Sequence, residues 1–396
     1  ANDAALRLAG IDASTPDPED GTIVRYEGSS EPTGMLFESA GLIVSRVKNQ
    51  LNPMTDDLWA DTSERAMQIL HSYGVTAFMD AGVSLPLMRA FKQLDNTGRM
   101  KSWVVGCMMA NNMIFDADPI GDGLVWQGEQ FRTEHFRPDF IKIFLDGIPP
   151  THTACFLEPY LPTAEHGAHH HGDIIISHDE LEDWMMRAAQ AGLGSKIHCT
   201  GDGSVRHVLD IAEKLRAEGY TTPLHLAHAQ FIVVEDIPRC ARLNVVTEIS
   251  PTLWFPGVIY EAIKLVIGEE RANQMQPNRS VLDAGGTVIG GSDWPVIPLP
   301  NPWLGIEGLI TRADPSGTFP GTLWKEQALT LDEAIAVYTT ASSKAMGLWS
   351  ETGSLEVGKS ADFIVLDRNP WETPETDLAD TQVLETWFAG ENVFIR

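Results

Sequence analysis

The chain has 396 residues, of which 43% are hydrophobic, and this is enough apolar material for one large domain or for a large domain with a small one. Its 55 acidic and 28 basic residues give a formal charge of −27, which disfavours binding to nucleic acid and to anionic membranes. No apolar run is long enough to span a bilayer, and no secretory signal is evident. We therefore expect a small-molecule partner rather than nucleic acid or a membrane. A homo-oligomer is compatible with the sequence.

The four cysteines lie at positions 107, 155, 199 and 240 and include no Cys-x-x-Cys pair. A disulfide framework and a structural zinc knuckle are therefore not expected. This spacing indicates a reducing compartment, and we expect the protein to be cytoplasmic.

From about residue 70, amphipathic stretches typical of helices alternate with short apolar runs typical of buried strands. Such alternation implies a parallel sheet with helical crossovers. One of the helices opens with Ser177-x-x-Glu180, at the spacing of a capping box. A closed (β/α)8 barrel needs eight strands, whereas an open doubly wound sheet can have seven, so the strand count leaves both architectures open. Seven strands are predicted, at residues 75–79, 103–108, 140–145, 194–198, 224–228, 245–249 and 287–291.

The pattern changes after residue 329. Residues 330–347 are predicted to form one helix, which opens with Thr330-x-x-Glu333 at capping-box spacing. Three short strand patterns follow, at residues 362–366, 383–387 and 392–395. We therefore divide the chain into a large α/β domain, residues 1–347, and a small β appendage, residues 348–396.

Residues that commonly bind metals lie at or near the ends of several predicted strands. His198 and His228 each end a strand, Asp293 follows another, and Lys142 lies within a fourth. Taken singly, each has an ordinary structural explanation, such as a hydrogen-bonded histidine, a capping aspartate or a lysine paired with an acid. In a barrel, however, these strand ends meet on one face. Two imidazoles and a carboxylate there would suit zinc or a related divalent ion.

Short motifs spread over the whole chain make the comparison more specific. They are residues 2–6 with 10–11, 32–36, 142–147 (Lys-Ile-Phe-Leu-Asp-Gly), 197–202 (Ile-His-Cys-Thr-Gly-Asp), 228–230 (His-Ala-Gln), 291–295 (Gly-Ser-Asp-Trp-Pro), 338–339 and 353–362. In these motifs the chain resembles the metal-dependent amidohydrolase superfamily, within it the branch of N-substituted formamide deformylases and YtcJ-like proteins. The resemblance implies a (β/α)8 TIM-type barrel, and it implies that the terminal strands form part of a small β-sandwich.

The resemblance also implies a metal site. His198, His228 and Asp293 match metal ligands of the family. Lys142 matches the position at which many members carry a carboxylated lysine that bridges two metals. One or two divalent ions are implied, with zinc as the preferred metal.

One part of the family pattern has no counterpart in this chain. The family carries a His-x-His pair on its first barrel strand, and no such pair occurs near the start of this sequence. The first sandwich strands of the family are also lacking. The first strand of the barrel is therefore missing from this chain, and we expect a strand ending in His-x-His upstream of Ala1.

The expected reaction is hydrolysis of a C–N bond of amide or N-formyl type, by an amidohydrolase acting on bonds other than peptide bonds. A metal-activated water would attack, with Asp293 as general base and with His228, or a nearby donor such as His152, helping to stabilise the oxyanion. His152, Trp254 and Trp294 follow strand ends and are candidate contacts to the substrate. The alternative is a non-catalytic barrel that binds or regulates, with an incomplete metal site.

Overall fold

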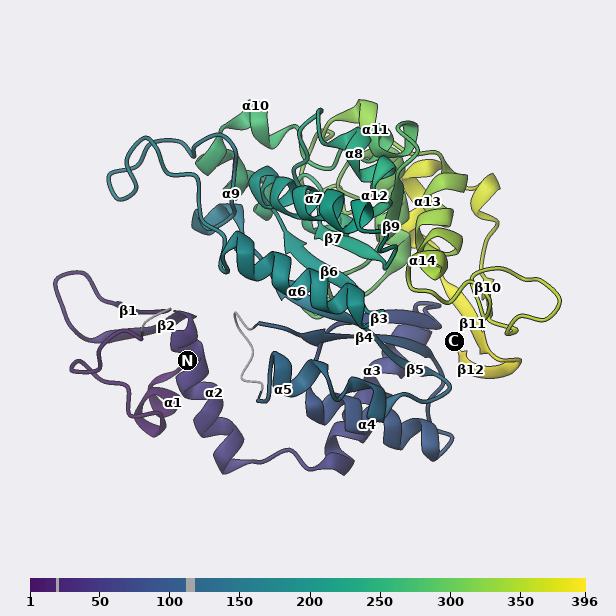
Figure 1. The fold of residues 1–396 in the computed structure, drawn as a ribbon, viewed down its shortest axis with the longest axis horizontal. Coiled ribbons are helices and arrows are strands. Elements are labelled where there is room, and N and C mark those ends of the chain that lie inside the picture. Colours follow the sequence, from purple (N-terminus) through teal and green to yellow (C-terminus); the bar gives the residue numbers. More distant parts are fainter. Residues whose placement is uncertain (19–20, 112–117) are drawn as a thin grey trace.

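The computed structural model describes residues 1–18, 21–111 and 118–396. A curled sheet of seven parallel strands forms its centre, and the strands are hydrogen-bonded in the order in which they occur in the chain (Figure 1). A doubly wound sheet would reverse its strand order, so this order favours a barrel-type fold. The two edge strands, β3 and β9, are not paired with each other in the described residues, which form a partial rather than a closed barrel. The strands are β3 (Ala77–Val83), β4 (Trp103–Met109), β5 (Phe136–Phe144), β6 (Gly194–Cys199), β7 (Leu224–His228), β8 (Val245–Ile249) and β9 (Thr287–Gly290).

Burial differs between the middle and the edge of this sheet. Every residue of β4, β6 and β8 is buried, as expected for parallel strands covered on both faces. In β3 only Val83 is buried, and the other residues are half-buried. The inner side of this edge strand is therefore incompletely covered by the described residues.

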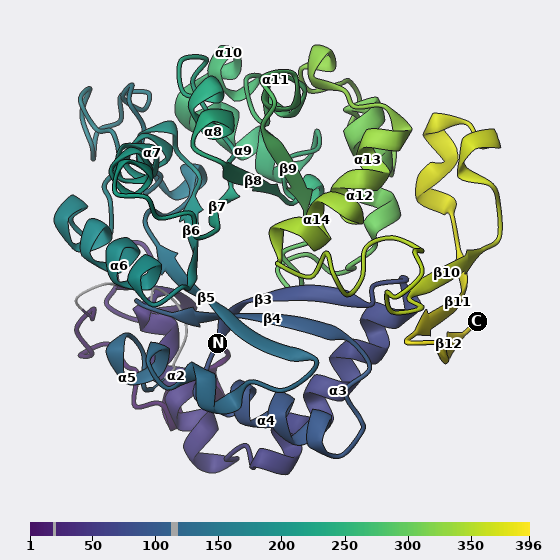
Figure 2. The same cartoon turned by 45° about the vertical axis from the view of Figure 1, so that its right-hand side comes forward.

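Helices cover the outer side of the curled sheet (Figure 2). The side chain of Ser177 accepts a hydrogen bond from the Glu180 amide at 3.2 Å, which confirms the predicted cap of α6. The helices of this layer and its connections are α3 (Asp56–Ser72), α4 (Leu85–Asn96), α5 (Asp122–Val125), α6 (His178–Gln190), α7 (Asp202–Ala217), α8 (Ile237–Arg242), α9 (Val258–Ile267), α10 (Glu269–Ala272), α11 (Asn278–Asp283), α12 (Pro302–Thr311), α13 (Leu331–Tyr338) and α14 (Thr340–Ala345). No helix of the described ranges has both the length and the apolar character needed to cross a membrane.

The prediction of one helix over residues 330–347 was wrong. Two helices, α13 and α14, meet at Thr339, whose φ of −126° and ψ of −93° are not helical. Tyr338, the last residue of α13, packs closely against Gly290 and Gly305, where a Cβ atom would collide with its ring or hydroxyl. No glycine or proline precedes residue 347 in this stretch, so the sequence carried no signal for the break.

Residues 1–51 form a small lobe to which the sequence analysis assigned no elements. It contains α1 (Asp3–Leu8), the antiparallel strands β1 (Gly21–Arg25) and β2 (Pro32–Glu38), and α2 (Ser39–Leu51). Its apolar centre is built by Leu6, Ile11, Ile23 and Ala40. In Figure 1 the lobe lies beside the curled sheet, and α2 leads toward α3.

Three antiparallel strands follow α14, and they confirm the predicted C-terminal β appendage. They are β10 (Phe363–Leu366), β11 (Val383–Phe388) and β12 (Glu391–Ile395), and they lie next to α3 (Figure 2). The Thr386 hydroxyl donates to the His71 carbonyl at 2.6 Å, and the Trp103 indole donates to Asp362 at 2.9 Å. These bonds attach the appendage to the large domain.

Glu333 joins the cap of α13 to α11. As predicted, Thr330 and Glu333 form a capping box, in which the Thr330 amide donates to the Glu333 carboxylate at 2.8 Å. The same carboxylate accepts two hydrogen bonds from the Arg279 guanidinium, at 2.7 and 2.8 Å. These bonds to Arg279 lower the pKa of Glu333 to about 2.

We predict that Glu333→Gln lowers the free energy of unfolding by about 1 kcal/mol at pH 7, since a cap and a partly exposed ion pair are weakened. The folded-state pKa lies below the unfolded value of about 4.3, so this contribution is present above that pH and is lost as the pH falls toward 2. Urea unfolding of both proteins between pH 2 and pH 7 measures the difference. A difference that stays constant over the whole range would contradict the prediction.

Candidate active site

Four of the predicted site residues lie on or directly after strands of the curled sheet. Lys142 lies on β5 and His198 on β6, His228 ends β7, and Asp293 follows β9. The imidazole centroids of His198 and His228 are 4.6 Å apart. Lys142, His228 and Asp293 line a cavity of about 900 Å³, which is also lined by residues of both edge strands. The strands thus bring these four residues to one region of the partial barrel.

A buried ion pair lies beside these residues and was missed by the sequence analysis. Lys196 on β6 and Glu248 on β8 are 5% and 9% exposed, and their Nζ and Oε2 atoms are 2.7 Å apart. Lys196 is paired in register with Lys142 on β5. It also precedes His198 by two residues, so period-two alternation could have placed both side chains on the same face of the sheet.

Burial and neighbouring charge set the protonation states in this region. Burial, reinforced by the charge of Lys196, lowers the pKa of Lys142 to about 8. Burial opposes ionisation of Glu248, but the charge of Lys196 prevails and lowers the pKa of that carboxyl to about 2. Burial also lowers the pKa of both imidazoles, His198 and His228. The imidazoles are therefore neutral at pH 7, the form in which histidine binds metals.

The ring of His198 is oriented by its hydrogen bond to the backbone. Its Nε2 atom donates to the Gly147 carbonyl at 3.0 Å, which places the proton on Nε2 and leaves the Nδ1 lone pair free. Gly147 admits no side chain, because a Cβ atom there would collide with Thr153. The loop after β5 thus selects the tautomer in which Nδ1 is unprotonated and its lone pair could bind a metal ion.

Asp146 holds this loop against the end of β6. Its fully buried carboxylate accepts hydrogen bonds from the amides of Cys155, Thr200 and Gly201 at 3.1, 3.0 and 2.9 Å. The Ser204 hydroxyl donates to it at 2.6 Å. Burial raises the pKa of Asp146 to about 6 against the opposing effect of these bonds, so the group is mainly ionised at pH 7.

The donor types fit a divalent cation, because two neutral imidazoles and a carboxylate are all suitable partners for one. Among the described residues, however, no three His, Cys, Asp or Glu side chains converge on one metal position. The described side chains alone therefore do not form a complete metal site.

The three predicted substrate contacts occupy different positions. Trp294 lines the large cavity. Trp254 is fully buried, and the Arg312 guanidinium lies 4.2 Å from the centroid of its ring. His152 is not among the residues that line the cavity, and its ring lies 5.0 Å from that of Tyr160 in the loop after β5.

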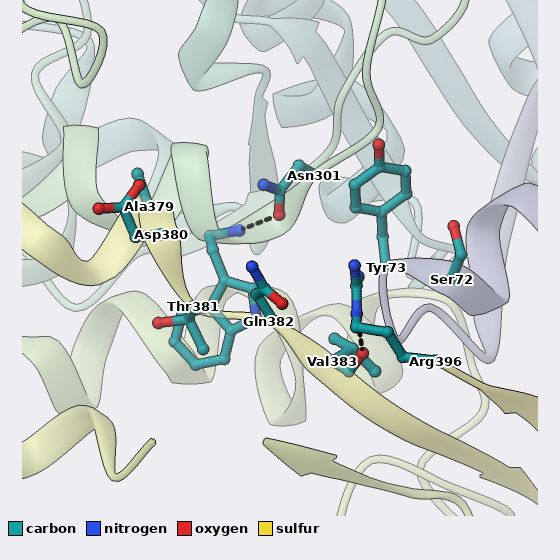
Figure 3. A pocket seen from close by; sticks show the side chains of 10 residues that line it. Ser72, Tyr73, Asn301, Ala379, Asp380, Thr381, Gln382, Val383 and Arg396 are labelled. Atoms are coloured by element: carbon teal, nitrogen blue, oxygen red, sulfur yellow. Dashed lines mark hydrogen bonds between the residues drawn. The ribbon is translucent and has the colours of Figure 1, made fainter. Parts of the chain in front are cut away.

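A second, smaller cavity of about 240 Å³ lies where the C-terminal appendage meets α3 and α12. Figure 3 shows Tyr73, Asn301 and Arg396 around it, with Arg396 donating to the Val383 carbonyl at 2.8 Å. None of the predicted site residues lines this cavity, so the large cavity is the candidate active site.

Comparison with known proteins identifies the family of this chain. The pattern of the amidohydrolase family matches residues 1–394. The chain belongs to the amidohydrolase family. It is 30% identical to the N-substituted formamide deformylase of Arthrobacter pascens, over 98% of this chain and 70% of that protein. It is 27% identical to the YtcJ protein of Bacillus subtilis (strain 168), over 99% of this chain and 71% of that protein.

A solved structure shares the fold of this amidohydrolase. An uncharacterised metal-dependent hydrolase from Pyrococcus horikoshii OT3 superposes with a TM-score of 0.73 at 24% identity, over 95% of this chain and 70% of that one. The family prediction made from the motifs is therefore confirmed, and the architecture is that of an amidohydrolase α/β fold.

For this amidohydrolase we predict that Asp146→Asn lowers the free energy of unfolding by about 2–3 kcal/mol. The NH2 group of the asparagine would face N–H and O–H donors and could not accept their hydrogen bonds. Asp210→Asn on α7 is the matched control, since Asp210 bonds Arg239 at the surface and its loss costs at most about 1 kcal/mol. Urea unfolding of the three proteins at pH 7 gives the comparison. Equal stability of the two variants would contradict the structural role of Asp146.

Proposed function

We propose that this amidohydrolase hydrolyses a C–N bond of amide or N-formyl type in a small molecule, a bond other than a peptide bond. The observation that carries the proposal is that Lys142, His228 and Asp293 line one cavity, and that the imidazole centroid of His198 lies 4.6 Å from that of His228. The relative from Arthrobacter pascens, an N-substituted formamide deformylase, supports the type of bond.

A divalent cation, with zinc preferred and one or two ions bound, would be held by His198, His228, Asp293 and Lys142. When bound, it would lower the pKa of a water molecule to about 7 and polarise the scissile carbonyl. An eighth strand with further histidine ligands would complete both the coordination shell and the barrel. The unpaired edges of β3 and β9 and the cavity between them support this part of the proposal.

Asp293 and His228 would carry out the proton and charge chemistry. Asp293 lies in the cavity wall, where its carboxylate can accept a proton from the attacking water and return it to the leaving nitrogen. The neutral imidazole of His228, in the same wall, would help to stabilise negative charge that develops on the carbonyl oxygen.

The loops around the cavity would contact the substrate. Trp294 would do so directly, because it lines the cavity. Trp254 and His152 are proposed as contacts that need a movement of their loops, since Trp254 is fully buried and His152 lies outside the lining. The barrel domain, residues 1–347, would supply the chemistry, and residues 348–396 would form part of a small β-sandwich.

We predict that Asp293→Asn in the full-length protein keeps its fold and part of its metal, while kcat for an N-formyl amine falls by at least ~10²-fold. Asparagine preserves the size of the side chain and one oxygen donor, but it cannot accept and return a proton. Metal content and kcat measured on the same sample decide the question. Near-normal turnover with metal bound would remove Asp293 from the chemistry and leave it a structural residue.

We predict that Lys142 carries a carbamate when two metal ions are bound, because a free ammonium group beside Lys196 and two cations would be strongly repelled. The lysine nitrogen forms a bond to the carbon of CO2 and releases one proton to solvent. Protein equilibrated with ¹³C-bicarbonate should give a carbamate carbon signal that is absent in Lys142→Ala. A Lys142→Ala variant that retains two metal ions and full activity would contradict the prediction.

A further inference from the structure

We propose that Gln276 is a positioning residue for His228, and that it holds the loop after β7 in the conformation that presents the imidazole to the cavity. The inference rests on the proposed function, in which His228 binds the metal ion. It concerns a residue 48 positions away in the chain, in the connection between β8 and β9.

The backbone at His228 requires such support. His228 and the next residue, Ala229, have φ angles of 71° and 40°. Two successive residues with side chains in the left-handed region are unfavourable, because each Cβ atom crowds the backbone. Conformations of this kind persist where the surrounding structure holds them in place. The contacts of this loop therefore determine where the His228 ring lies.

Gln276 makes hydrogen bonds to the residues on either side of Ala229. Its side-chain Nε2 atom donates to the His228 carbonyl at 2.8 Å. Its backbone amide donates to the Gln230 carbonyl, also at 2.8 Å. The two bonds bracket Ala229, and a rotation of the peptide unit between His228 and Ala229 would break the bond to the His228 carbonyl.

Gln276 is itself firmly placed. It is fully buried and has a φ of 59°. The carbonyl of the preceding residue, Met275, accepts a hydrogen bond from the Arg312 guanidinium at 3.1 Å. Arg312 in turn donates to the Leu323 carbonyl at 2.8 Å and lies over the Trp254 ring. The bonds that fix His228 therefore continue into the packed interior beneath α12.

The oxygen of the Gln276 amide indicates that the bond donated by the amide nitrogen is the main contribution of this side chain. The Oε1 atom of Gln276 is buried and finds no hydrogen-bond donor among the described residues. A buried acceptor without a partner is unfavourable, so a leucine would suit this position better if packing alone mattered. The bond to the His228 carbonyl accounts for an amide at this place.

The test measures Zn²⁺ affinity of the full-length protein by competition with a chromophoric chelator at pH 7. Gln276→Leu should weaken Zn²⁺ binding by about 10-fold, the lower end of the effect of groups that orient metal ligands. The matched control is Gln327→Leu, because Gln327 is also a buried amide but bonds Ser280 instead. The control should keep its Zn²⁺ affinity within about twofold. Equal affinity of the Gln276→Leu and unmodified proteins would overturn the proposal.

A double-mutant cycle separates positioning from a general loss of stability. If Gln276 acts through His228, Gln276→Leu should cause no further loss of Zn²⁺ affinity in a His228→Asn background. An equal loss in both backgrounds would overturn the proposal. Should Gln276→Leu fail to fold by circular dichroism, Gln276→Met takes its place in the cycle with the same expected results.

The same cycle separates a failure of His228 as a metal ligand from a failure of Gln276 as its positioning residue. A His228→Asn protein that binds Zn²⁺ as tightly as the unmodified protein would overturn the proposed role of His228 as a metal ligand, and with it the proposed role of Gln276. If His228→Asn weakens Zn²⁺ binding but Gln276→Leu leaves it unchanged, only the proposed role of Gln276 is overturned.

Discussion

The charge balance inside the curled sheet constrains the whole candidate site. Lys142 and Lys196 occupy paired positions on β5 and β6, and both are almost fully buried. Among the described residues, Glu248 is the acidic side chain that forms an ion pair with Lys196, and no ion pair to Lys142 is formed. Room for Glu248 depends on Gly291, where a Cβ atom would lie 2.6 Å from its carboxylate. Burial and the nearby charge of Lys196 destabilise the ammonium form of Lys142, and this favours reactions that remove its charge.

The open side of the sheet, between β3 and β9, is also where the large cavity lies. In the part of the chain that the structure describes, β3 and β9 have unpaired edges, and β3 is only half-buried along most of its length. Unpaired strand edges and half-covered apolar side chains are both unfavourable until another element covers them. A single strand between β3 and β9 would satisfy these edges and would bring its own side chains to the cavity that Lys142, His228 and Asp293 line.

The sequence predicted those parts of the fold that depend on long apolar runs. All seven parallel strands were found, since buried strands such as β4 consist largely of apolar residues. The edge strand β3 was placed about two residues too early, at residues 75–79 rather than 77–83, because half-exposed strands have weaker patterns. The break at Thr339 and the lobe of residues 1–51 were not predicted, since short elements and tertiary packing leave little periodicity.

For the candidate site, the sequence identified side chains at strand ends but not the residues that hold them. Asp146 and Gln276 act on neighbours that are distant in the chain, and no local pattern relates Gln276 to His228. The left-handed backbone of His228 and Asp293 was equally unreadable, because neither position is a glycine. Such conformations exist only where hydrogen bonds from other segments oppose their strain. The position of the His228 ring therefore depends on the connection between β8 and β9, and a change in that connection can move the imidazole without replacing it.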